Sequence, residues 1–260
     1  MTFVSNLHSI QSERHPGPQE AEFEALSREL TEKELELATL ENELWVFEKR
    51  YARTVGLLFL ELDILERKIA RELFRLNPEE QYRQAFQKAE KKAQVSQEAM
   101  DEKTDQEEEK AYIPTEDMKS LFRKVAKTIH PDFAVNEAER AFRTELMARA
   151  NEAYKNGDKE ALEQILYEWE HRDKNLFKKE EALNEQNQLE RKIAQIKARL
   201  KQIESRIREL KKFELYQLML KVKRADRVGR DLLGEMAADL RGQIQEARKL
   251  LDSLKQQRAG

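Results

Sequence analysis

The chain has 260 residues, 38% of them charged, and a formal net charge of −3 at pH 7. Only 7 Gly and 5 Pro are present, which argues against a sheet-rich fold with many turns, and the absence of Cys excludes disulfides, thiolate catalysis and cysteine zinc sites. No apolar stretch reaches the roughly 18 residues of a membrane span, and no secretory signal is visible, so we expect a soluble, cytoplasmic protein. Because good helix formers dominate, we expect it to be all-α.

Residues 1–19 are polar and lack periodicity, so we expect a flexible N-terminal tail. From residue 20, apolar side chains recur mostly at alternating spacings of three and four, the a/d pattern of a coiled coil. They are Phe23, Leu26, Leu30, Leu37, Leu40, Leu44, Phe47 and Tyr51. The spacing then lengthens to Val55, as a four-residue stutter would produce. Asn77-Pro78 should end this helix, because proline disfavours the helical conformation in the preceding residue.

A second helix is expected from about residue 79, with an apolar side formed by Tyr82, Phe86, Ala89 and Ala93. Residues 98–117 then contain nine acidic and two basic side chains, which is typical of a solvated helix end leading into a linker near 111–114. We therefore assign residues 20–111 to N-terminal coiled-coil helices with a break at Asn77-Pro78.

The segment after Pro114 predicts three shorter helices. Thr115 is suited to cap the first, whose residues 118–130 include four cations and no acid: Lys119, Arg123, Lys124 and Lys127. Its other face is apolar, with Leu121, Phe122, Val125, Ala126 and Ile129. Pro131 should stop this helix, and Asp132 follows. A second helix is expected over about 137–155, ending at Asn156-Gly157, and a third runs to Trp169.

The run SLFRKVAKTIHPD, followed after an intervening helix by ANEAY, resembles the J-domain of DnaJ-type co-chaperones over about residues 112–170. The resemblance implies an antiparallel helix pair joined by a loop with His130, Pro131 and Asp132, which we call the HPD loop. It also implies binding to the ATPase domain of a DnaK-type chaperone through this loop and the basic helix (Lys119, Arg123, Lys124 and Lys127), with stimulated ATP hydrolysis. The family's short first helix is missing from the sequence. We assign residues 112–172 to this J-like domain.

Residues 173–260 predict a second coiled-coil arm with an apolar repeat that includes Ile193, Ile196, Leu200, Ile203 and Ile207. Gly229 and Gly234 leave open whether this arm is a rod or a hairpin. Residues 20–76 contain 14 acids and 9 bases, whereas residues 172–230 contain 18 bases and 9 acids. We expect the arms to pair, acid on base, in an elongated antiparallel bundle that carries the J-like segment at one end with its loop exposed. Pairing between two copies of the chain is equally compatible with these seams.

Three classes of function follow from these patterns. The first is a J-domain co-chaperone whose arms hold a protein client. The second is a structural coiled-coil scaffold with a J-like spacer, and the third is a nucleic-acid-binding coiled coil, which we consider weaker because no aromatic stacking platform accompanies the basic residues. His8, His15, His130 and His171 are too dispersed for a metal site, and no phosphate loop or nucleophile elbow is present. We expect neither a cofactor nor an enzymatic site of its own.

Overall fold

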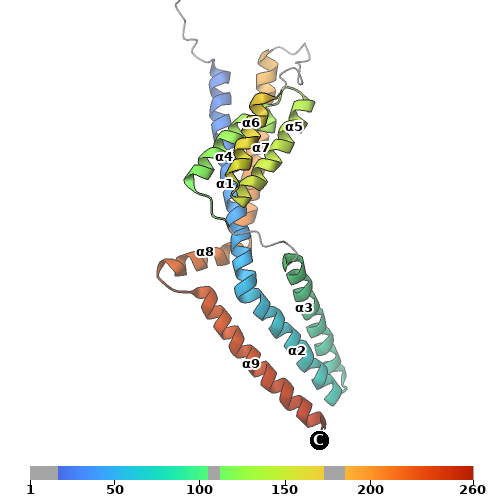
Figure 1. The fold of residues 1–260 in the computed structure, drawn as a ribbon. Coiled ribbons are helices and arrows are strands. Elements are labelled where there is room, and N and C mark those ends of the chain that lie inside the picture. Colours follow the sequence, from blue (N-terminus) through green and yellow to red (C-terminus); the bar gives the residue numbers. More distant parts are fainter. Residues whose placement is uncertain (1–16, 105–111, 173–184, 260) are drawn as a thin grey trace, which may run out of the picture.

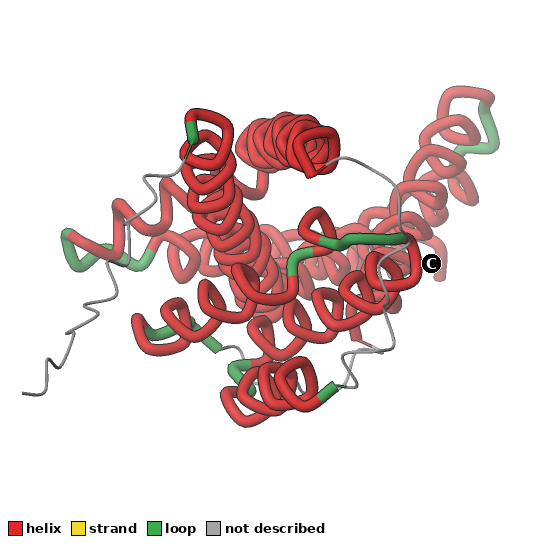
Figure 2. Tube along the Cα trace, turned by 90° about the horizontal axis from the view of Figure 1, so that it is seen from above, coloured by secondary structure: helices red, strands yellow, loops and turns green. Residues whose placement is uncertain are grey.

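The computed structural model describes residues 17–104, 112–172 and 185–259. Within these ranges the chain consists of helices joined by short turns, with no strand (Figure 2). The prediction of an all-α protein is therefore confirmed. Residues 1–16 of the predicted tail, residues 105–111 of the acidic segment and residues 173–184 of the C-terminal arm lie outside the described residues, and the last two residues of the predicted tail belong to the first helix.

A long helical rod begins the described chain. It consists of α1 (Pro18–Tyr51), a π-helical turn η1 (Ala52–Gly56) and α2 (Leu57–Leu76), and it bends near the π-helical turn (Figure 1). The π-helical turn follows Tyr51, where the apolar spacing lengthens. Because an inserted residue rotates the helix locally, the seam can continue on the buried side, and Val55 is fully buried.

The basic arm pairs with the acidic rod inside the same chain, but in the parallel direction. In α7 (Glu185–Lys212), Lys197 pairs with Glu22 and Arg206 pairs with Glu41, so residue numbers rise together along the two helices. The expected acid-on-base pairing is observed, whereas the expected antiparallel direction is wrong. Apolar seams and complementary charges are compatible with both directions. The direction is parallel because the chain returns through the small helices described below, so that α7 starts beside the beginning of α1.

The C-terminal arm is neither a single rod nor a simple hairpin. After α7 the chain turns aside into α8 (Glu214–Arg227), reverses at Gly229, which has a φ of 75°, and descends as α9 (Leu232–Ala259) along α2 (Figure 1). Ion-paired residues are 165 positions apart for Glu41–Arg206 and 187 apart for Glu61–Arg248. Between these two ion pairs the C-terminal arm is therefore longer than the rod, and α8 with its turns accounts for the extra residues.

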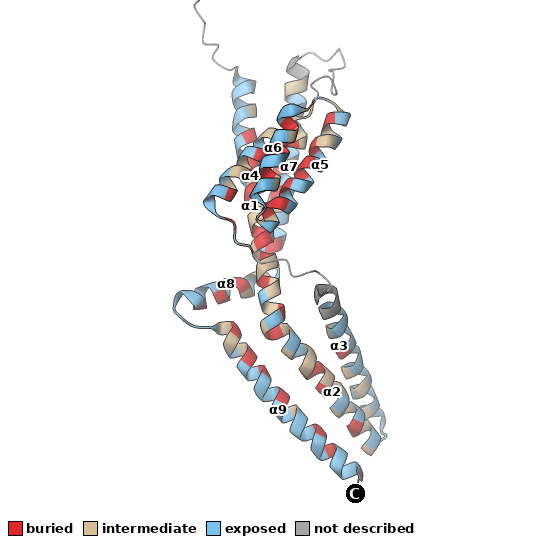
Figure 3. Cartoon of the chain, viewed as in Figure 1, coloured by how far each residue is buried: buried red, intermediate tan, exposed pale blue. Residues whose placement is uncertain are grey.

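The helix α3 (Glu80–Thr104) folds back on α2 after Asn77-Pro78, at the predicted break. Its Lys92 ammonium lies 2.7 Å from the buried carboxylate of Asp63, and the Ser96 hydroxyl donates to the same carboxylate at 2.6 Å. α2 therefore lies between α3 and α9, and buried residues recur along α2 and α9, whereas Ala93 is the one buried residue among the described side chains of α3 (Figure 3).

A small lobe is formed by α4 (Glu116–Ile129), the 3-10 turn η2 (Pro131–Phe133), α5 (Glu137–Asn156) and α6 (Lys159–His171). It has a core of its own that includes Phe122, Ile129, Leu146, Tyr154, Leu162 and Trp169. Leu35 and Ala38 of α1 join this core. The lobe therefore lies along the side of α1, and the expected position at one end of the bundle is wrong.

Candidate functional site

The basic helix α4 is built from a capped start and one buried face. The Met118 amide donates to the Thr115 hydroxyl at 3.3 Å, which satisfies one of the free amides at the helix start. Phe122 and Ile129 are fully buried on the inner face. Lys124 and Lys127 are exposed on the outer face, as the amphipathic pattern predicts.

The other two predicted cations are engaged in ion pairs. Lys119 lies 2.7 Å from Glu116, and this hydrogen bond raises the pKa of Lys119 above its ordinary value. The Arg123 guanidinium lies 2.9 Å from Glu32 of α1. The structure thus divides the four predicted binding residues: two point to solvent, one is paired within its own helix, and one is paired with the rod.

The HPD loop begins with a buried imidazole. His130 is 3% exposed, and its Nδ1 accepts a hydrogen bond from the Asp132 amide at 3.1 Å. Because Nδ1 is an acceptor there, Nε2 carries the proton and donates to the Glu34 carboxylate on α1 at 3.2 Å. We expected the loop to be exposed, and for His130 that expectation is wrong.

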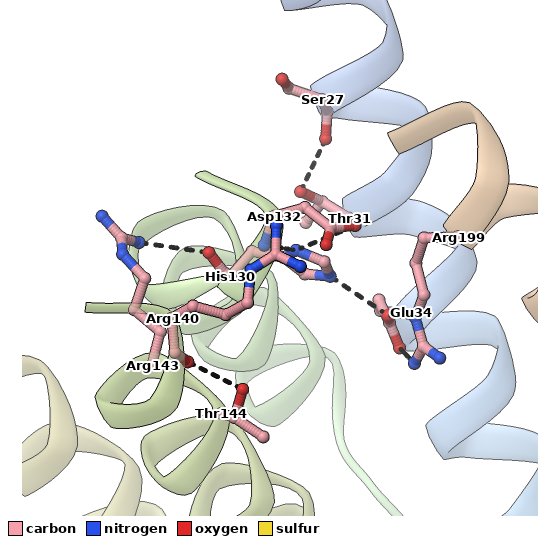
Figure 4. A network of polar contacts seen from close by, with 9 residues as sticks. All are labelled: Ser27, Thr31, Glu34, His130, Asp132, Arg140, Arg143, Thr144 and Arg199. Carbon is pink, nitrogen blue, oxygen red and sulfur yellow. Dashed lines mark hydrogen bonds and ion pairs between the residues drawn. The ribbon is translucent and has the colours of Figure 1, made fainter. Parts of the chain in front are cut away.

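Glu34 connects the loop to both long helices (Figure 4). Its carboxylate also accepts from Arg199 of α7, at 2.8 Å to Nε and 3.2 Å to Nη2. Burial by itself would raise the pKa of Glu34, but the hydrogen bonds from His130 and Arg199 outweigh it and lower the pKa below its ordinary value. We call Glu34, Arg199 and His130 the clasp.

A buried arginine, Arg143, holds the other side of the loop. Arg143 of α5 donates to the carbonyl oxygens of Thr128 and His130, at 3.0 and 3.3 Å, and pairs with Glu139 at 2.8 Å. Its guanidinium lies over the Trp169 ring, 4.1 Å from the centroid. Burial lowers the pKa of Arg143, while the hydrogen bond that Arg143 donates to Glu139 opposes that change. Arg143 thereby anchors the C-terminal end of α4 to α5 and α6.

Asp132 is the loop residue whose side chain is least engaged. Its Oδ2 is buried and has no hydrogen-bond partner among the described residues, and it lies 3.9 Å from His130 Nδ1. The carboxyl lines a cavity of about 340 Å3 between the loop, α5 and α7. Other lining residues are Glu34, His130, Pro131, Thr144, Asn151 and Arg199.

The NEAY segment lies where α5 ends. Tyr154 is fully buried, packs at a tilt against Phe122 with ring centroids 4.6 Å apart, and its hydroxyl forms a 2.9 Å hydrogen bond with Thr39 of α1. Gly157 follows in a left-handed conformation under the Tyr112 ring. These contacts show that the basic helix and the NEAY segment are packed together in one lobe.

Sequence reasoning missed Glu34, Arg199 and Arg143. A signal for Glu34 was present: it stands between Leu30 and Leu37, at the one interruption in the apolar seam of α1. A charged residue at a seam position requires a partner when the seam is buried. Nothing in the local sequence identified that partner as a loop histidine 96 residues away.

No helix in the described ranges is long and apolar enough to cross a membrane. The described residues also contain no group of three or more His, Asp or Glu side chains placed to hold a metal ion. Comparison of the chain with models of protein families, with curated proteins and with solved structures found no match. The resemblance to J-domains therefore rests on the residues and contacts described above.

Proposed function

We propose that this chain is a J-domain-type co-chaperone that binds a DnaK-type chaperone and stimulates its ATPase. The observation that supports this most is the placement of His130, Pro131 and Asp132 in the turn between two antiparallel helices. The contacts from Arg143 to Thr128, near the turn, and from Tyr154 to Phe122, farther from it, establish the antiparallel direction of α5 and α4. This is the arrangement that the resemblance implies.

The proposed contact surface is the exposed side of α4 together with Asp132. Lys124 and Lys127 present two cations to solvent, and Asp132 has a carboxylate oxygen without a hydrogen-bond partner in the described chain. Such a surface fits a partner with an acidic patch next to a cationic side chain. Because exposed charges are screened by salt, we expect binding to weaken as ionic strength rises.

The rod supports the lobe on one side. Leu35 and Ala38 of α1 pack against the lobe core, and Thr39 bonds to Tyr154. The lobe is thus covered on one side by a helix from more than 70 residues earlier in the chain.

The apolar seams that we expected to hold a client are buried between α1 and α7 and between α2 and α9. Client binding would therefore use other surfaces, such as the exposed side chains of Leu57 and Phe59 near the bend of the rod.

A structural scaffold remains the second candidate, and one observation favours it. His130 is buried and bonded to Glu34, so the histidine has a structural role in this conformation. On this reading the HPD loop attaches the small lobe to the rod and recruits no chaperone.

The two candidates are separated by measuring ATP hydrolysis of a DnaK-type chaperone with the full chain and with Asp132→Asn. We expect the substitution to abolish stimulation while the helical content stays unchanged, because the Asp132 carboxyl is little involved in the fold. Glu163→Gln, which removes the same charge from the exposed side of α6, is the matched control and should retain stimulation. Equal ATPase rates with wild type and Asp132→Asn would contradict the co-chaperone function.

A further inference from the structure

We propose that the clasp is an autoinhibitory contact, which holds the HPD loop against the rod and must open before the chaperone can bind. This inference rests on the proposed function and adds its regulation. It starts from a conflict in the structure: the loop that should meet a partner is covered by two helices of its own chain.

The loop is held at two points. At the first, His130 bonds to Glu34, which is itself held by Arg199. At the second, the Phe133 ring packs edge-on against Phe23 of α1, with centroids 5.8 Å apart. Residues on both sides of Pro131 and Asp132 are therefore attached to the rod, and the backbone between them cannot move away without breaking both contacts.

The clasp also places a residue of α7 across from the loop. Arg199 lines the same cavity as Asp132, while its guanidinium pairs with Glu34. A partner side chain that approaches Asp132 from this direction meets α7 first. Release of the lobe from α1 and α7 would remove this obstacle and leave the Asp132 carboxylate facing solvent.

The lobe has a core formed mainly by α4, α5 and α6, to which α1 adds Leu35 and Ala38. Besides the clasp, polar contacts attach the lobe to the rod: Arg123 with Glu32, Tyr154 with Thr39, and the Asn42 amide with the Tyr112 carbonyl. Full release of the lobe therefore requires separating this apolar contact as well as the polar ones.

A second ion pair between α1 and α7 provides a control for the clasp. Glu34–Arg199 and Glu41–Arg206 have the same separation of 165 residues and lie one heptad apart along α1 and α7. Glu34 additionally bonds to His130, whereas Glu41 pairs with Arg206 of α7. Glu41→Ala therefore removes an ion pair at the same register between the long helices, although a more exposed one, without touching the loop.

The experiment measures ATPase stimulation at limiting concentrations of the full chain carrying Glu34→Ala or Glu41→Ala. We expect Glu34→Ala to raise stimulation about fivefold or more, the lower range of typical coupling between sites, and Glu41→Ala to stay near wild type. The double variant Glu34→Ala/Asp132→Asn should give no stimulation, because the opened loop still needs its carboxylate.

Failure of the clasp and failure of the proposed function give different results. If neither wild type nor Glu34→Ala stimulates ATP hydrolysis, the co-chaperone function is wrong. If both stimulate equally and Asp132→Asn is inactive, the function stands and autoinhibition is overturned.

Hydrogen exchange provides a readout that needs no chaperone. We expect Glu34→Ala to accelerate amide exchange in residues 130–134 relative to Glu41→Ala, while the core of the lobe stays protected. If circular dichroism shows that Glu34→Ala unfolds, Phe23→Ala replaces it, because it weakens the second attachment point from the rod side. Unchanged exchange and unchanged stimulation in Phe23→Ala would then overturn the proposal.

Discussion

Individual buried charges, rather than apolar contacts alone, determine how the HPD loop is held. Arg143 anchors the loop to the lobe through two backbone carbonyls, and Glu34 anchors it to the rod through His130. A buried charge is tolerated only when it is paired and hydrogen-bonded. Removal of either side chain therefore leaves its partner buried without a hydrogen bond, which destabilises the fold.

For the lobe anchor we predict that Arg143→Met lowers the free energy of unfolding by about 3 kcal/mol, because Glu139 is left buried without its cation. Arg149→Met is the control, since Arg149 and its partner Glu168 are both largely solvent-exposed, and it should cost less than about 1 kcal/mol. Urea denaturation followed by circular dichroism measures both. Equal losses in the two variants would show that burial of the pair contributes nothing.

For the rod anchor we predict a pH dependence from the lowered pKa of Glu34. A carboxyl with a lowered pKa in the folded state stabilises that state above its ordinary value of 4.5 and loses this contribution as pH falls through the folded-state pKa. The difference in unfolding free energy between wild type and Glu34→Gln should therefore be constant near neutral pH and shrink below pH 4.5. A difference that grows with acidification would contradict the assignment.

Breaks and turns between the helices decide which segments can meet. Two of these turns use glycines with nearly the same left-handed backbone, Gly157 with φ 72° after α5 and Gly229 with φ 75° after α8. Their surroundings differ. A Cβ atom at Gly157 would lie 2.5 Å from the Tyr112 ring, whereas a Cβ atom at Gly229 would have open space around it, with no atom of a non-adjacent described residue within 4 Å.

The pair gives a prediction that separates backbone strain from crowding. Gly229→Ala should cost about 1 kcal/mol, the usual penalty for a side chain in the left-handed region. Gly157→Ala should cost clearly more, because the Tyr112 ring must also move away from the turn. Thermal and urea unfolding of the two variants provide the comparison. Equal losses of unfolding free energy would mean that the Tyr112 ring moves aside without an energetic penalty.

At the scale of the whole molecule, the long helices are held together by one continuous apolar seam with ion pairs along its edges. Leu40, Leu200 and Ile203 are buried in this seam, whereas the arginines and lysines that pair across it remain about half exposed. Burial contributes about 25 cal/mol per Å2 of apolar area, while an exposed pair contributes at most about 1 kcal/mol.

We therefore predict that Leu200→Asp lowers the free energy of unfolding by at least about 4 kcal/mol, since it puts a charge into the seam. Lys201→Asp, at the exposed neighbouring position, should change it by less than about 1 kcal/mol. Wild-type stability should change little in 1 M salt, where the screening length is about 3 Å. A large loss of stability in salt would instead identify the ion pairs as the main source of cohesion.

The features that the sequence predicted are those determined by neighbouring residues. Helix composition predicted the all-α fold, Asn77-Pro78 predicted the break before α3, and Thr115 predicted the start of α4. Each depends on backbone preferences within a few positions, so no distant contact was needed. The bringing together of His130, Pro131 and Asp132 in one turn was implied in the same way, because these residues are consecutive.

Tertiary structure alone decided the direction of the arms, the position of the lobe and the state of the loop. An apolar stripe packs against a parallel or an antiparallel partner, so the seams left both directions open. The side-chain partner of His130 on the rod is Glu34 of α1, and Glu34 in turn bonds to Arg199 of α7, 165 positions away. Such contacts depend on how whole helices are placed relative to one another, and local sequence patterns do not specify that placement. The covering of the HPD loop therefore became visible only when the chain was folded.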